Sequence, residues 1–127
     1  MKTLLQLATA VLAASSMAAA AGTAELDKLN VLYIGDTGTP RAQHFTGFLR
    51  KNVGRVEATS RKDFKPADAA EFDVVLLDWP QSETAREECK AGRSPLGNRA
   101  AWSKPTVLLG SAGLNLAVVW KIRGGSG

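Results

Sequence analysis

The apolar run before Asp78 limits what this chain can fold into more than any other stretch. Residues 74–77 are all apolar and show no alternation with polar residues. Such a run is typical of a strand that is covered on both faces, as in a parallel sheet between helices. Pro80 cannot donate a hydrogen bond to a neighbouring strand, so we expect the strand to end before it. Asp78 is then placed at the carboxyl end of the strand, where open α/β sheets bind their ligands.

Further stretches have the composition of strands, and helix-like segments separate them. Residues 31–34 and 105–110 contain apolar runs, whereas residues 55–60 alternate weakly, as suits a strand at the edge of a sheet. Strands that alternate with helices predict parallel βαβ units with right-handed connections. The sequence therefore predicts one α/β domain built on a parallel sheet.

The segments between the strands carry helix signals. Thr39 can cap a helix over residues 40–52, which begins with proline and continues with apolar residues at helical spacing. We expect a second helix over residues 82–90 and a third over residues 111–121. A strand over residues 116–122 remains the alternative to the third helix, because apolar and β-branched residues are dense there.

Residues 1–24 have the composition and order of a secretory signal peptide. Lys2 is their one charged residue, an apolar stretch covers residues 4–14, and small residues dominate residues 18–24. The apolar part is too short for a stable membrane-spanning helix. The alternative is an amphipathic helix, which the absence of charge before Glu25 disfavours. We predict cleavage between residues 20 and 24, and export to the periplasm or the extracellular space without a stable membrane span.

The mature segment, residues 25–127, is short for a complete doubly wound domain. Removal of Lys2 lowers the formal net charge from +4 to +3, and no long run of like charges is present, so a solvated surface is favoured over nucleic-acid binding. Cys89 is the sole cysteine, which excludes an internal disulfide and metal sites that need several cysteines. The chain stops where a further strand would be expected, so we interpret it as the N-terminal part of such a domain.

A sheet with the order 2-1-3-4 would bring the candidate binding residues to one edge. Asp36, Asp78 and Ser111 follow neighbouring strands in that order, and together they could bind a cation or a polyol, or orient a water. Alternatively, both acids only satisfy backbone N–H groups at turns. Trp79 could stack on a sugar, although packing in the core is more frequent for tryptophan. His44, the only histidine, is either a general base or ligand, or a partly buried helix residue.

No complete catalytic or cofactor motif accompanies these residues. Residues 36–40 lack the glycine pattern of a dinucleotide site and the Lys-Ser/Thr pair of a phosphate loop. Residues 110–113 resemble a nucleophile elbow only in part, because Ala112 holds the nucleophile position and no histidine follows it. Cys89 follows two glutamates, which would raise its pKa and make it a poor nucleophile. The catalytic residues are therefore unknown, and we predict neither a metal site nor a cofactor.

Residues 31–36, 73–78 and 105–113, with Gly124 and Gly125, resemble the class I glutamine amidotransferase-like superfamily. Within it, the chain is most similar to the trehalose-utilisation (ThuA-like) branch. The resemblance implies a flavodoxin-like α/β fold, with a three-layer parallel sheet, and a carbohydrate-linked role. It does not imply glutaminase activity, because Ala112 stands where the amidotransferase cysteine would be expected. The later histidine and acid of the superfamily would lie beyond Gly127.

The sequence leaves three functional hypotheses. The first is an exported amidotransferase-like protein without glutaminase activity, which binds or modifies a carbohydrate-like ligand. The second is a non-catalytic periplasmic ligand-binding module. The third is a receiver domain in which Asp78 would accept a phosphoryl group near the hydroxyl of Ser111. It ranks last, because a receiver would have paired acids after the first strand and only Asp36 is present. Nothing in the sequence predicts the oligomeric state.

Overall fold

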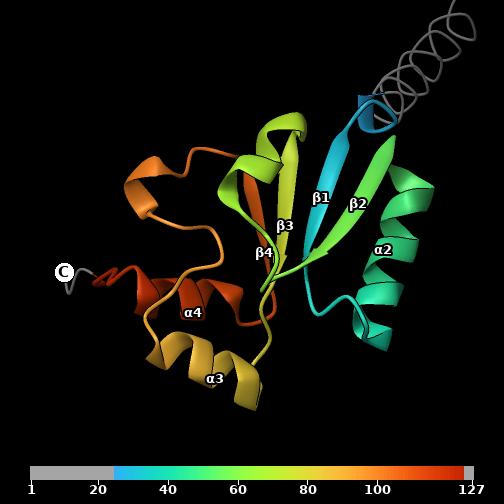
Figure 1. The fold of residues 1–127 in the computed structure, drawn as a ribbon. Coiled ribbons are helices and arrows are strands. Elements are labelled where there is room, and N and C mark those ends of the chain that lie inside the picture. The colour runs from blue at the N-terminus through green and yellow to red at the C-terminus, as the bar shows by residue number, and fades with distance from the viewer. Residues whose placement is uncertain (1–24, 125–127) are drawn as a thin grey trace, which may run out of the picture.

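The computed structural model describes residues 25–124, so the predicted signal peptide lies outside the described residues. Strands and helices alternate along this part of the chain (Figure 1). In chain order they are β1 (Asn30–Gly35), α2 (Pro40–Asn52), β2 (Arg55–Ser60), β3 (Val74–Asp78), α3 (Glu83–Lys90), β4 (Thr106–Leu109) and α4 (Ala112–Val119), with short 3-10 helices at Pro66–Glu71 and Arg99–Ala101.

The strands form one 4-stranded parallel sheet in the order β2-β1-β3-β4. Val31 of β1 lies between Val56 of β2 and Val74 of β3, and Leu77 of β3 lies beside Leu108 of β4. The predicted α/β fold with the strand order 2-1-3-4 is therefore confirmed. The weakly alternating strand β2 lies at one edge of the sheet, as its sequence predicts.

Local signals fix the beginnings of two helices. The hydroxyl of Thr39 accepts a hydrogen bond from the N–H of Ala42 at the start of α2, and Ser82 does the same for Ala85 in α3. Both predicted helices are confirmed. Residues 112–119 form the helix α4, so the alternative of a strand over residues 116–122 is wrong.

The main hydrophobic core lies between the sheet and the helices α3 and α4. Leu32, Val75 and Leu77 point into it from the strands, and Leu116 reaches it from α4. The residues that alternate with these point to the other face, where α2 packs, because successive side chains of a strand leave opposite sides of a sheet. Helices therefore cover both faces of the sheet.

The edge strand β4 and the outer side of α4 expose apolar side chains. Val107 and Leu108 are 47% and 43% exposed, and Leu114 and Val118 of α4 are more exposed still.

None of the helices within residues 25–124 has the length and apolar character needed to cross a membrane.

Candidate ligand-binding site

The carboxyl ends of β1, β3 and β4 lie side by side at one end of the sheet. We call this end, which runs across the strands, the carboxyl edge. Asp36 follows β1, Asp78 is the last residue of β3, and Ser111 follows β4. Because the strands are parallel and adjacent, the sheet brings these residues to the same end of the molecule (Figure 1). This is the position that open α/β sheets use for ligands.

Asp78 is buried and fully engaged by protein groups. The phenol of Tyr33 donates a hydrogen bond of 2.6 Å to its Oδ2 atom. Arg41, in the first turn of α2, donates from Nε to Oδ2 at 2.8 Å and from Nη2 to Oδ1 at 3.0 Å. Since Asp78 is 2% exposed and both of its oxygens accept hydrogen bonds, it holds α2 against the sheet and presents no free oxygen to solvent.

The surroundings of Tyr33 favour its neutral form. The phenol is buried between the sheet and α2, and its ring stacks on Phe45 with centroids 6.4 Å apart. Burial, together with the hydrogen bond to Asp78, raises the pKa of Tyr33 well above its ordinary value. The guanidinium of Arg41 lies over the same Phe45 ring at 5.0 Å, which completes a packed layer beneath α2.

Arg61 is the residue that joins the loops of the carboxyl edge. Its Nη2 atom lies 3.0 Å from Oδ1 of Asp36, its Nε atom lies 3.1 Å from Oε2 of Glu88, and its Nη1 atom donates to the main-chain oxygen of Asp78 at 3.1 Å. Its side chain is only 2% exposed. Burial acts to lower the pKa of Arg61, but Glu88 and Asp36 outweigh it and raise the pKa, so the guanidinium stays charged.

Asp36 is the accessible carboxylate of the edge. Its side chain is 43% exposed, and its Oδ1 atom is paired with Arg61. No hydrogen bond or ion pair to its Oδ2 atom occurs among residues 25–124. Asp36 can therefore accept a hydrogen bond from a ligand, whereas Asp78 is a structural ion pair.

The other residues proposed from the sequence lie in different surroundings. Trp79 is fully buried in the core, and its Nε1 atom has no hydrogen-bond partner in the described part of the chain, so its ring offers no face for stacking. Ser111 is partly buried, and its hydroxyl does not cap α4. His44 is exposed on α2, where its ring meets Phe45 edge-on, and it makes no described polar contact with the carboxyl edge.

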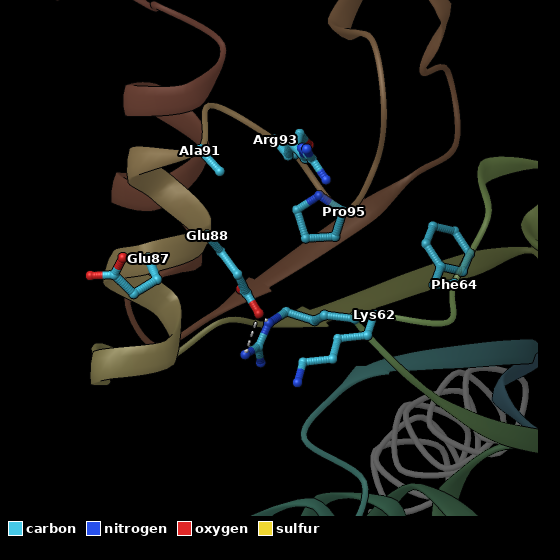
Figure 2. A pocket seen from close by; sticks show the side chains of 9 residues that line it. Lys62, Phe64, Glu87, Glu88, Ala91, Arg93 and Pro95 are labelled. Carbon is cyan, nitrogen blue, oxygen red and sulfur yellow. Dashed lines mark hydrogen bonds and ion pairs between the residues drawn. The ribbon is translucent and has the colours of Figure 1, made fainter.

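A pocket of about 500 Å³ opens beside Arg61, between the segment that follows β2 and the C-terminal part of α3 with its following loop (Figure 2). Its lining combines cations, carboxylates and apolar atoms. Besides Arg61, the lining includes Lys62, Phe64, Glu87, Glu88, Arg93 and Pro95.

Sequence reasoning missed Arg61 and this pocket. Arg61 follows the edge strand β2 in a polar stretch, and an arginine in such a place is usually solvated. Its burial depends on Asp36 and Glu88, which are 25 and 27 positions away in the chain.

Within the described range, no group of three or more His, Cys, Asp or Glu side chains could hold a metal ion.

Comparisons with family models, with curated proteins and with solved structures give no match for this chain. The resemblance to the glutamine amidotransferase-like superfamily therefore stays a prediction that rests on the strand and turn sequences.

Proposed function

We propose that this chain is an exported glutamine amidotransferase-like, ThuA-like domain protein without glutaminase activity, which binds a carbohydrate-like ligand at the carboxyl edge. Ala112, the buried first residue of α4, stands where the amidotransferase cysteine would be expected. The sole cysteine, Cys89, belongs to α3. Burial, followed by the charge of Glu88, raises the pKa of its thiol, which disfavours the reactive thiolate.

The pocket beside Arg61 is the observation that carries this proposal. Its volume of about 500 Å³ falls in the range of small-molecule sites. Its lining offers donors, on Lys62 and Arg93, and an acceptor, on Glu88, beside the apolar surfaces of Phe64 and Pro95. Hydroxyl groups both donate and accept hydrogen bonds, and a sugar ring also has apolar C–H faces, so a polyhydroxylated ligand matches this mixture.

Binding without catalysis, as in a periplasmic ligand-binding module, is favoured over modification of the ligand. Both oxygens of Asp78 already accept hydrogen bonds, and the group is buried, so from this position it cannot take a proton from a ligand or a water. His44 is exposed on α2 and contacts neither Asp36 nor Asp78 through a described hydrogen bond. No general base is therefore assembled among these candidates.

Calorimetric titration with a panel of sugars, including trehalose, tests the proposal. We expect at least one sugar to bind, and Asp36→Asn to weaken its affinity by roughly tenfold, because the substitution weakens the ion pair that holds Arg61 in the pocket lining. Asp27→Asn is the matched control, since Asp27 is exposed before β1, at the opposite end of the sheet. The proposal fails if no sugar binds to the unaltered protein.

A further inference from the structure

We infer that the ligand of the pocket beside Arg61 carries an anionic group, a carboxylate or a phosphate, which Lys62 and Arg93 bind. The inference rests on the proposed function and narrows it, because it names the ligand as an acidic sugar. Carboxylate and phosphate share the chemistry that matters here, which is a negative charge spread over several acceptor oxygens.

The carboxylates that line the pocket already have cationic partners. Glu88 is paired with Arg61 at 3.1 Å, the contact that a dashed line marks in Figure 2. Glu87 is paired with Lys90 at 2.7 Å, and Figure 2 shows its carboxylate pointing away from the other labelled side chains. Neither acid therefore has to be neutralised by Lys62 or Arg93.

The cations Lys62 and Arg93 line the same pocket without such partners. Both side chains are exposed, and neither forms an ion pair within residues 25–124. They come from different segments, Lys62 from the residues after β2 and Arg93 from the loop after α3 (Figure 2). The fold thus places two positive charges without a described ion-pair partner on the lining of one cavity, and both would attract an anion bound there.

Arg61 is a fixed part of the pocket lining, and its charge is already paired. Its guanidinium is held by Asp36, Glu88 and the main-chain oxygen of Asp78, so it does not depend on a ligand for its position. The positive charge available to a ligand therefore comes from Lys62 and Arg93, which line the same pocket.

The choice between an acidic and a neutral sugar follows from this arrangement. A neutral sugar would occupy the pocket and leave Lys62 and Arg93 uncompensated. A carboxylate or a phosphate would accept charge-assisted hydrogen bonds from both, which are roughly twice as strong as neutral ones. Because both cations are exposed, salt should screen part of the binding free energy that these charge-assisted hydrogen bonds contribute.

Calorimetric titration of the protein with glucose, glucuronate, glucose 6-phosphate and inorganic phosphate tests the inference. We expect glucuronate or glucose 6-phosphate to bind at least tenfold more tightly than glucose, with an advantage that shrinks as sodium chloride is raised. The double variant Lys62→Gln/Arg93→Gln should lose this advantage. The matched control is Arg50→Gln/Lys51→Gln, which removes the same charge from the exposed C-terminal turn of α2 and should keep the advantage.

The outcomes separate this inference from the proposed function. Glucose binding as tightly as both acidic sugars would overturn the inference and leave a carbohydrate-binding protein. A preference for acidic sugars that survives in the double variant would also overturn the inference. If the double variant folds poorly, the single variants Lys62→Gln and Arg93→Gln give the same readout. Phosphate binding that needs Lys62 and Arg93, without binding of any sugar, would support the anion site and overturn the carbohydrate proposal. No binding of any probe would overturn both.

Discussion

Tyr33, Arg41 and Asp78 form a polar cluster between the sheet and α2. A buried carboxylate is costly unless it is paired and hydrogen-bonded, and here one phenol and one guanidinium satisfy both of its oxygens. The cluster therefore fixes how α2 sits on the sheet. It also makes the stability of the fold sensitive to alkaline pH, because an ionised phenol would face the Asp78 carboxylate at the distance of a short hydrogen bond.

The phenol of Tyr33 should stay protonated in the folded protein at pH values where an ordinary tyrosine ionises. Its pKa is raised in the folded state by burial and by Asp78. Stability from this group is therefore fully present below the unfolded pKa of about 10 and falls as the pH rises above it, because the unfolded chain releases the proton first. Tyr33 is the only tyrosine, so absorbance near the phenolate band reports on it alone.

We expect the phenolate signal of the native protein to appear only together with loss of the folded circular dichroism spectrum. The protein in guanidinium chloride is the control and should titrate near a pH of about 10. Tyr33→Phe should flatten the decline of unfolding free energy above that pH. A native titration midpoint at the ordinary tyrosine value would contradict the burial and the hydrogen bond described for Tyr33.

The turn between β4 and α4 depends on one glycine. Gly110 has a φ of 59°, a left-handed conformation that side chains with a Cβ atom adopt at a cost. A Cβ atom there would also lie 3.2 Å from Nη2 of Arg41, which is bonded to Asp78. The turn between β4 and α4 therefore lies close to the polar cluster beneath α2, although β4 and α2 are far apart in the sequence.

We expect Gly110→Ala to lower the free energy of unfolding by about 1–2 kcal/mol, mainly through the left-handed backbone. Gly38→Ala is the control, because Gly38 does not have a positive φ and a Cβ atom added there would meet no atom within 4 Å beyond its chain neighbours. Urea denaturation of both variants measures the difference. Equal stability of the two variants would show that the turn tolerates a side chain.

Sequence reasoning was most successful where the signal is local to an element. The apolar run of β3 and the capping residues Thr39 and Ser82 each act on their own neighbours, and the structure confirms them. The segment after residue 111 was ambiguous because its valines suit a strand, whereas tertiary contacts decide for a helix. Leu116 packs in the core, and Asn115 donates to the main-chain oxygen of Trp79 at 3.0 Å.

The site as a whole was harder to predict than its elements. The strand order brings Asp36, Asp78 and Ser111 to one edge, as the sequence predicts. The hydrogen-bond partners of the two acids could not be read in advance, because Arg41 and Arg61 reach them across packed elements. Trp79 likewise directly follows a strand in the sequence, but its burial in the core depends on α3 and α4 covering that face.

At the scale of the whole chain, the proposals depend on the compartment in which the protein works. Extracytoplasmic sugars are available to a protein that carries a functional leader, and residues 1–24 have the composition of one. Expression of the full chain in a bacterial host should therefore release a protein that begins between residues 21 and 25, as measured by intact mass and N-terminal sequencing. The variant that lacks residues 2–24 should stay in the cytoplasm. An uncleaved, cytoplasmic full chain would contradict export. It would also remove the reason to search for the ligand among extracytoplasmic sugars. The titrations would still test whether the pocket binds a ligand.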